Sequence, residues 1–199
     1  PPTGSTMEEA IQNILEGKDE KKPFPLALKP ELVERILIHL ESGKDVILVG
    51  APGVGKTALA RRILGYRSNL LRKGNPVVAV AHADWTRRDL IGGLNLESTK
   101  FSRGKMLEAI EDEKLLLIDE FNRADINKAF GEMFYAIEYG KITLSEDEGK
   151  IHPSKDNTVD IPEDFEFMGT MNDFDKNLLL TELSYGLITR LAFVDVEPD

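Results

Sequence analysis

The 199-residue sequence contains no cysteine, which excludes disulfide bonds and thiolate metal sites. A chain without cysteine fits a reducing compartment, and we expect the protein in the cytoplasm. Basic residues are also in the minority, because 25 lysines and arginines stand against 35 acidic residues, for a formal net charge of −10. This balance argues against a surface broadly committed to DNA or RNA, although a local basic loop can still contact phosphate.

Long apolar runs and clustered histidines are lacking as well. No apolar stretch approaches the ~20 residues that a membrane-spanning helix needs, and the acidic segment from Met7 does not resemble a signal peptide. We therefore expect no membrane association. The three histidines (His39, His82 and His152) are scattered without the spacing of a metal site, so we expect none of them to bind a metal ion.

Hydrophobic periodicity divides the chain into an N-terminal region, residues 1–30, and an α/β core, residues 31–199. The N-terminal region consists of a tail, a short helix and a proline-containing connector. In the core, short apolar segments predict five buried strands, near residues 45–50, 77–82, 114–119, 165–170 and 191–196. Helices are expected between them, over residues 31–42, from Lys56 onward, 104–112 and 125–138. Strands that alternate with helices predict one domain with a parallel sheet covered on both faces.

A phosphate-binding pattern joins the first predicted strand to the helix that follows it. The sequence GAPGVGKT, residues 50–57, matches G-x-x-x-x-G-K-[ST]. Its glycines let backbone N–H groups turn toward phosphate oxygens, and the helix N-terminus adds partial positive charge. Lys56 is then placed for the β- and γ-phosphates, and the Thr57 hydroxyl for Mg²⁺. The expected nucleotide-binding residues are Gly50, Ala51, Pro52, Gly53, Val54, Gly55, Lys56, Thr57 and Ala58.

Two adjacent carboxylates end the strand predicted at residues 114–119. A bound Mg²⁺–triphosphate needs an anionic ligand at the end of a neighbouring strand, and Asp119 occupies that position. Glu120 points differently and is the candidate general base that activates a water for attack on the γ-phosphate. An Asp-Glu pair at a strand exit is often only a solvated feature. Its combination with the phosphate-binding pattern favours the catalytic interpretation.

In the order of these motifs, the chain resembles the AAA+ NTPases. GAPGVGKT resembles the Walker A motif, LLLIDE the Walker B motif and FMGTMND the sensor-1 strand. Within AAA+, three runs are similar to the MoxR/McrB/dynein-related group: DEFNRADINKAFGE, IPEDFEFMGTMNDFD and DLIGG. The resemblance implies a three-layer P-loop NTPase core with a five-stranded parallel sheet of order 5-1-4-3-2. It also implies assembly as a hexameric ring with nucleotides between neighbouring subunits.

The resemblance implies roles for four residues outside the Walker motifs. Asn172 matches the position that orients the attacking water, and Asp175 completes an N-x-x-D pair with it. Arg190 matches the arginine that reaches the active site of the neighbouring subunit, although Leu191 stands where relatives carry Phe. A structural ion pair is the alternative role for Arg190. Arg123, in the NRA signature, is expected either to contact the neighbour's nucleotide or to brace Asp125 or Glu120 locally.

Two insertions and a missing lid complete the comparison with the family. Residues 141–161 indicate a polar hairpin, which the resemblance identifies as a pre-sensor insertion. The resemblance also implies an insertion over the loop at residues 92–105, whose Lys100, Arg103 and Lys105 are the best candidates for contact with an anionic polymer. A solvated basic loop is an equally good interpretation. The helical lid and sensor-2 arginine of the family are absent from these 199 residues, so we expect weak hydrolysis by this piece alone.

These expectations combine into one leading functional hypothesis with two alternatives. The leading hypothesis is a Mg²⁺-dependent ATPase that uses ATP between subunits of a ring to remodel or move a protein or DNA partner. The first alternative is a GTP-driven restriction motor of the McrB type that acts on DNA with a nuclease, because phosphate motifs do not distinguish ATP from GTP. The second is a nucleotide-gated binding scaffold with little hydrolysis.

Overall fold

The computed structural model describes residues 4–18, 24–95, 99–152, 156–172 and 189–197. Its centre is a parallel sheet whose strands lie in the order β2-β5-β8-β1-β9. The strands are β1 (Asp45–Val49), β2 (Gly74–Val80), β5 (Lys114–Asp119), β8 (Phe167–Met171) and β9 (Leu191–Asp195). When only these five strands are numbered along the chain, the order from β9 to β2 is the predicted 5-1-4-3-2. The predicted fold class is therefore confirmed.

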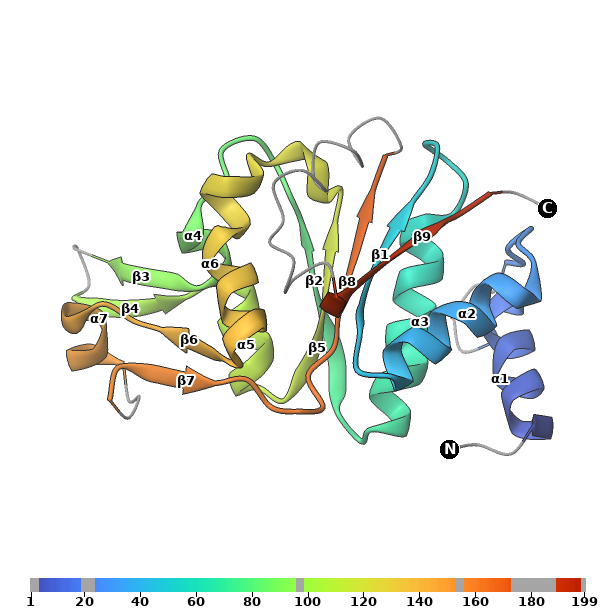
Figure 1. Ribbon diagram of the computed structural model, residues 1–199, viewed down its shortest axis with the longest axis horizontal. Coiled ribbons are helices and arrows are strands. Elements are labelled where there is room, and N and C mark those ends of the chain that lie inside the picture. Colours follow the sequence, from blue (N-terminus) through green and yellow to red (C-terminus); the bar gives the residue numbers. More distant parts are fainter. Residues whose placement is uncertain (1–3, 19–23, 96–98, 153–155, 173–188, 198–199) are drawn as a thin grey trace.

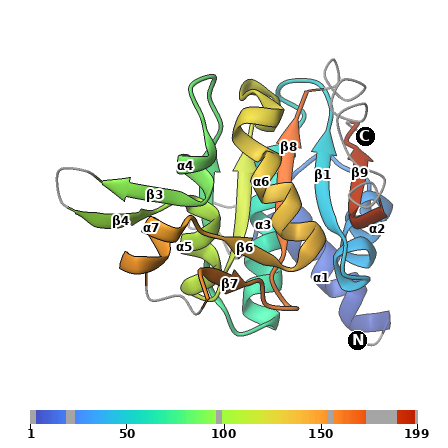
Figure 2. The same cartoon turned by 60° about the vertical axis from the view of Figure 1, so that its left-hand side comes forward.

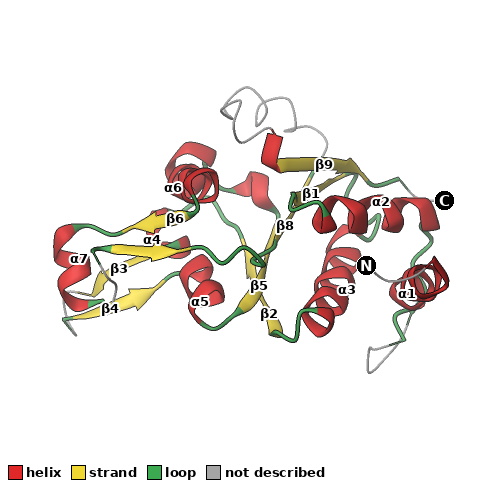
Figure 3. Cartoon of the chain, turned by 60° about the horizontal axis from the view of Figure 1, so that its bottom comes forward, coloured by secondary structure: helices red, strands yellow, loops and turns green. Residues whose placement is uncertain are grey.

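Helices cover both faces of the sheet, as Figure 3 shows. One face carries α1 (Gly4–Glu16), α2 (Pro30–Glu41) and α3 (Lys56–Leu70), and the other carries α5 (Lys105–Glu111) and α6 (Ile126–Tyr139). Successive residues of a strand point to opposite faces. Val46 and Leu48 accordingly join the hydrophobic cluster under α2 and α3, while Ile47 and Val49 join the cluster under α6. Both faces are buried, as expected for a parallel sheet.

The N-terminal helix α1 is attached to the core through Arg62 of α3. The buried guanidinium of Arg62 donates hydrogen bonds to the backbone carbonyls of Ile14 (3.1 Å), Leu15 (2.9 Å) and Phe24 (2.6 Å). It also lies over the Phe24 ring, 4.5 Å from the centroid. Apolar residues of α1 share a hydrophobic cluster with α2 and α3. The N-terminal helix therefore packs as part of the layer on that face.

Two antiparallel hairpins project from the core beyond α5 and α6 (Figures 1 and 2). The predicted hairpin at residues 141–161 is formed by β6 (Lys141–Thr143) and β7 (Thr158–Asp160), with the short helix α7 (Glu146–Ile151) between them. The segment expected to be a loop, residues 92–105, instead forms a second hairpin of β3 (Gly92–Asn95) and β4 (Lys100–Arg103). The loop prediction was wrong because two large apolar residues of the segment, Leu94 and Phe101, pair across the strands, and Phe101 packs against His152 of the other insertion.

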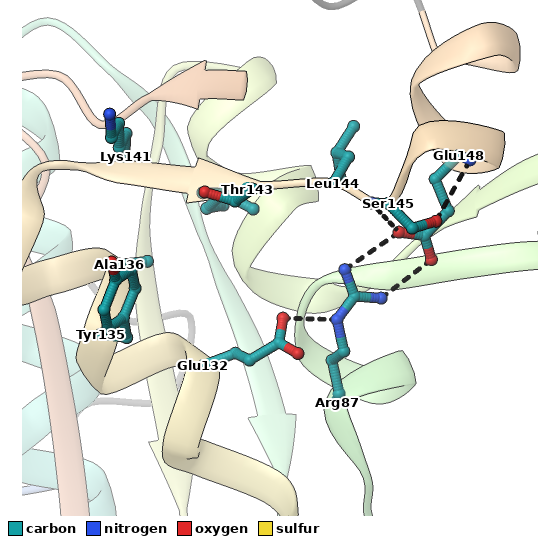
Figure 4. A pocket seen from close by; sticks show the side chains of 10 residues that line it. Arg87, Glu132, Tyr135, Ala136, Lys141, Thr143, Leu144, Ser145 and Glu148 are labelled. Carbon is teal, nitrogen blue, oxygen red and sulfur yellow. Dashed lines mark hydrogen bonds and ion pairs between the residues drawn. The ribbon is translucent and has the colours of Figure 1, made fainter. Parts of the chain in front are cut away.

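A single arginine connects both insertions to the core. Arg87, the first residue of α4 (Arg87–Leu90), forms a two-point ion pair with Glu148 of α7, at 2.9 and 3.0 Å, and a further ion pair with Glu132 of α6. Figure 4 shows the guanidinium between these two carboxylates, beside an open cavity of about 470 Å³. Arg87 also donates to the backbone carbonyl of Gly92 in β3 (3.1 Å). Arg87 therefore links α6 to both hairpins.

None of the described helices is long and apolar enough to cross a membrane.

A buried ion pair fixes α3 to the segment that leads into β8. The Nε atom of Arg67 donates to Glu166 Oε1 and Oε2, at 3.1 and 3.0 Å, and Nη2 contacts Oε1 as well. We expect Arg67→Ala to lower the free energy of unfolding by about 3–5 kcal/mol, because it leaves the Glu166 carboxylate buried without its partner. Chemical denaturation followed by circular dichroism measures the change. The control is Arg61→Ala, an exposed arginine on the same helix, and equal losses in the two variants would contradict the prediction.

Candidate nucleotide-binding site

The phosphate-binding loop connects β1 to α3, as predicted. Gly53 and Gly55 have positive φ angles of 83° and 93°, which L-residues rarely adopt. At Gly50 a Cβ atom would lie 2.5 Å from the carbonyl oxygen of Val196, so only glycine fits. The Lys56 ammonium donates to the carbonyl oxygens of Gly50 (2.6 Å) and Ala51 (2.8 Å). The loop is thus shaped by contacts that require glycine, and its lysine is held directly over it.

A cavity of about 410 Å³ opens in front of this loop. It lies where the carboxyl ends of β1, β5 and β8 meet, the usual ligand position in an open α/β sheet. Its lining brings most of the predicted site residues together: Pro52, Gly53, Gly55, Lys56, Thr57, Ala58, Asp119, Glu120, Arg123 and Asn172, with Thr170 and Met171. Asp175 lies outside the described residues, and Arg190 lies elsewhere, as detailed below.

Asp119 is bonded to hydroxyls from two other elements. Its Oδ1 atom accepts a hydrogen bond from Thr57 Oγ1 (2.7 Å) at the start of α3, and another from Thr170 Oγ1 in β8. Carboxylate and hydroxyl oxygens are ligands that suit Mg²⁺, which usually binds one or two protein groups and completes its shell with phosphates and water. No group of three or more His, Asp or Glu side chains within the described residues could hold a metal ion. The donor set therefore fits a magnesium ion shared with a nucleotide.

The backbone of Glu120 adopts a left-handed conformation, with φ 56° and ψ 43°. A non-glycine residue in this region costs about 1–3 kcal/mol and persists only where the surroundings enforce it. Two contacts do so. The Glu120 amide donates to Thr170 Oγ1 (3.1 Å), and the next residue, Phe121, is fully buried and stacks on Phe130 at 3.8 Å between ring centroids. The left-handed turn separates the Glu120 carboxylate from that of Asp119.

Thr170 was not among the predicted site residues. Its hydroxyl links Asp119 to the Glu120 amide, and the residue is 1% exposed. A sequence signal for it does exist: a lone hydroxyl residue in the apolar strand FMGTM must find a partner when buried. Asn122 was missed too, and its Oδ1 accepts from the Asn172 amide (3.3 Å), which joins the end of β8 to the turn after β5.

Arg123 contacts its own subunit's Glu120. Its Nε atom forms an ion pair with Glu120 Oε2, while 62% of the side chain is exposed. Asp125, the other expected partner, instead caps α6 by accepting from the Lys128 amide (2.9 Å). Within one subunit, the geometry matches a local brace for Glu120. A contact with a neighbour's nucleotide stays a prediction.

Arg190 lies at the amino ends of the parallel strands, whereas the phosphate-binding loop lies at their carboxyl ends. It immediately precedes Leu191, which pairs with Asp45 at the start of β1, whereas the loop follows the end of that strand. Five residues of strand place the two ends roughly 15 Å apart. Arg190 Nη1 donates to the carbonyl oxygen of Ile137 (2.8 Å), near the C-terminus of α6. Arg190 therefore does not reach the cavity of its own subunit.

Asp45, beside Arg190, has a strongly perturbed pKa. Burial raises the pKa of its carboxyl to about 7, and the nearby Glu166 charge adds to the rise. A hydrogen bond from the Phe167 amide (2.8 Å) and the charge of Arg190 oppose it. This carboxyl therefore changes its charge near neutral pH.

Two of the basic side chains in the β3–β4 hairpin and at the start of α5 are paired with acids. Arg103 contacts Glu111 (3.3 Å) and Asp112 (2.8 Å), and Lys105 contacts Glu108 (2.9 Å). Charges committed to carboxylates are less available to an anionic polymer, so the geometry favours the solvated interpretation of this segment.

Comparison with known proteins identifies the family. Residues 45–191 match the AAA domain in its dynein-related subfamily. The chain belongs to this AAA family. Over 216 aligned residues it is 28% identical to the EcoKMcrB subunit of the type IV methyl-directed restriction enzyme of Escherichia coli K12, an alignment that covers 100% of this chain and 43% of the relative. The predicted membership of the MoxR/McrB/dynein-related group is therefore confirmed.

Two solved structures share the AAA fold of this chain. A candidate ATPase from Cytophaga hutchinsonii superimposes with a TM-score of 0.58 at 17% identity, over 98% of this chain and 53% of that one. NtrX from Brucella abortus superimposes with a TM-score of 0.59 at 15% identity, over 97% of this chain and 40% of that one. At these identities the likeness shows the fold alone. The chain spans less than half the length of the curated relative it matches.

One prediction for the cavity concerns the Thr170 hydroxyl. We expect Thr170→Val to lower the free energy of unfolding by about 1–3 kcal/mol, because Asp119 and the Glu120 amide each lose a buried partner. We also expect weaker Mg²⁺-dependent nucleotide binding, since Asp119 and Glu120 are no longer held in place. Thermal denaturation and titration with a fluorescent nucleotide measure the two effects. Thr170→Ser keeps the hydroxyl and should retain most of both; a loss equal to that of the valine variant would contradict the proposed role of the hydroxyl.

A further prediction concerns Asp45, whose titration makes the free energy of unfolding depend on pH. A carboxyl whose folded pKa lies above its unfolded value keeps its proton in the folded state, so its stabilising contribution is lost as the pH rises from about 4 to about 7. The free energy of unfolding of Asp45→Asn, relative to wild type, should therefore shift in the variant's favour by up to about 4 kcal/mol over that range. Denaturation at a series of pH values measures the shift. Glu163→Gln, which changes an exposed carboxylate of the same region, should show none.

Proposed function

We propose that the chain is the nucleotide-hydrolysing core of a Mg²⁺-dependent ATPase that assembles as a ring and uses ATP to remodel or move a macromolecular partner. The family resemblance implies that this ring is a hexamer. The observation that supports this most is the convergence of Lys56, Thr57, Asp119 and Glu120 on one cavity in front of the phosphate-binding loop. Membership of the AAA family adds that nucleotide binding and hydrolysis are the general activity of such domains.

Each residue of the cavity has a distinct proposed role. Lys56 and the N–H groups of the loop bind the phosphates, and Thr57 and Asp119 would hold Mg²⁺. A bound Mg²⁺ would supply positive charge that offsets the negative charge of the phosphates. Glu120, turned away from Asp119 by its left-handed backbone, accepts a proton from the attacking water.

Two more residues lie beside the water position in this proposal. Asn172 lines the cavity and orients the water. Asp175, as part of the N-x-x-D pair that the family resemblance implies, assists it. Arg123 pairs with Glu120 and is proposed to hold that carboxylate until nucleotide and a neighbouring subunit are in place.

The position of Arg190 supports an assembly. An arginine near the transferred phosphate compensates its developing charge, and the arginine that lines the cavity within one subunit, Arg123, is paired with Glu120. Arg190, exposed just before β9, is proposed to supply this charge to the nucleotide of a neighbouring subunit. A ring of like subunits satisfies this requirement, because head-to-tail contacts place the same surface of each subunit against the nucleotide of the next.

A GTP-driven motor that acts on DNA is the second candidate. It is favoured by the 28% identity to a subunit of a methyl-directed restriction enzyme, which extends over the whole of this chain. The two candidates share the phosphate chemistry and differ in the base and the partner. A binding scaffold with little hydrolysis is the third, and the presence of Glu120 argues against it.

The test is a hydrolysis panel with ATP and GTP, each with and without DNA, on the assembled protein. We expect Glu120→Gln to lower kcat by about 10²–10⁴-fold while nucleotide binding is retained, because only proton transfer is removed. Lys56→Ala should lose binding itself. Glu113→Gln, an exposed carboxylate before the other end of the same strand, is the matched control and should leave turnover unchanged.

Each outcome of the panel decides between the candidates. Preferential turnover of ATP supports the leading proposal, and GTP turnover stimulated by DNA supports the second candidate. Turnover by Glu120→Gln at the wild-type rate would overturn the general-base assignment. Nucleotide binding without turnover in the wild-type assembly would support the scaffold.

A further inference from the structure

A cavity of about 240 Å³ lies at the amino ends of the strands, on the side of the sheet away from the phosphate-binding loop. Its lining includes an unusual number of charged groups for its size: Lys44, Asp45, Glu163, Glu166 and Arg190. Glu166 is already neutralised by its ion pair with Arg67 on the opposite layer. Among the remaining charges, Arg190 acts on the Asp45 carboxyl, whose pKa it lowers.

Strand register brings these two residues together. Asp45 opens β1 and pairs with Leu191 in β9, so Arg190 directly precedes the residue beside Asp45. The Arg190 side chain then extends toward α6, where Nη1 donates to the Ile137 carbonyl oxygen (2.8 Å). Within the described part of the chain, no carboxylate lies close enough to form an ion pair with Arg190 directly. The Arg190 guanidinium is thus hydrogen-bonded to the Ile137 carbonyl and interacts with the Asp45 carboxyl through its charge.

The Asp45 carboxyl is held in place but only partly committed. Its Oδ1 atom accepts from the Phe167 amide (2.8 Å), which fixes its direction at the start of β8. Lys44, Glu163 and Glu166 complete its charged surroundings from the preceding turn and from the segment before β8. Burial raises the pKa of this carboxyl to about 7, so its negative charge develops as the pH rises through neutrality.

We propose that Asp45 is a positioning residue for Arg190: the Ile137 carbonyl holds one end of the guanidinium, and the Asp45 charge attracts it across the shared cavity, so that the arginine is oriented toward the nucleotide of the neighbouring subunit. This inference rests on the proposed function, because it presumes that Arg190 acts across the subunit boundary. A guanidinium presents several N–H donors in a fixed plane, so one side can be held by the protein while the other meets phosphate.

The physical benefit is a smaller loss of entropy at the moment of reaction. A free arginine side chain carries about 2 kcal/mol of rotamer entropy, which must be lost when it meets the phosphate. Anchoring by Ile137 and Asp45 removes part of that freedom in advance. Since the attraction needs an ionised carboxylate, the anchoring strengthens as the pH rises through the Asp45 titration.

The test is the pH profile of kcat on the assembled protein, with the hydrolysed nucleotide in excess. For wild type, kcat should rise between about pH 6 and about pH 8.5. For Asp45→Asn, kcat should be lower by about tenfold at the high end and within about twofold of wild type at the low end, with KM unchanged. Glu163→Gln removes a carboxylate from the same cavity and should retain the wild-type profile. Melting temperatures at each pH verify that the variants are folded.

A second arm separates this inference from the proposed function. In an Arg190→Ala background, which lacks the cation that Asp45 attracts, Asp45→Asn should have no further effect on the profile. If Arg190→Ala hydrolyses nucleotide at the wild-type rate, Arg190 does not act in catalysis, and both the trans role and the inference fall. If Arg190→Ala is impaired but Asp45→Asn keeps the wild-type profile, the trans role stands and only the inference is overturned. A higher kcat in Asp45→Asn at the high end would likewise overturn it.

Discussion

The carboxylate of Asp119 is the point on which the arrangement of the site depends. One of its oxygens accepts hydrogen bonds from Thr57 at the start of α3 and from Thr170 in β8, while Asp119 itself ends β5. Three elements that are distant in the sequence are thereby fixed to a single atom. The same Thr170 hydroxyl accepts from the Glu120 amide and so supports the left-handed turn. Asp119, the start of α3 and Glu120 are therefore positioned as one unit, which is what their proposed roles require.

The parallel sheet separates two kinds of chemistry. All five strands run in the same direction, so their carboxyl ends carry the phosphate-binding loop, Asp119 and Asn172, and their amino ends carry Asp45 and Arg190. A rigid sheet cannot bring the amino ends and the carboxyl ends of its strands together within one subunit. Any joint action of Glu120 and Arg190 on one phosphate thus requires two copies of the chain. The proposed assembly is therefore argued from strand direction and not from a particular interface.

Sequence reasoning succeeded where a residue's role is local. The apolar run before Asp119 and the glycine pattern at residues 50–57 are readable because strand burial and phosphate binding each constrain contiguous residues. It failed where partners are distant in the chain. Thr170 matters through residues about 50 positions away, and the hairpin at residues 92–103 is stabilised in part by His152. The pKa of Asp45 depends on burial and on Glu166, neither of which its neighbours in sequence reveal.

The route from the site to the insertions is short and made of stiff parts. Glu120 leads through the 3-10 turn η1 (Phe121–Arg123) to Asp125, which caps α6. Glu132, two turns further along that helix, contacts Arg87, and Arg87 holds Glu148 of α7. A helix transmits a displacement of its first turn along its whole length, because its backbone hydrogen bonds resist bending. A change at Glu120 that moves the cap of α6 must therefore either move both hairpins or break the ion pairs of Arg87.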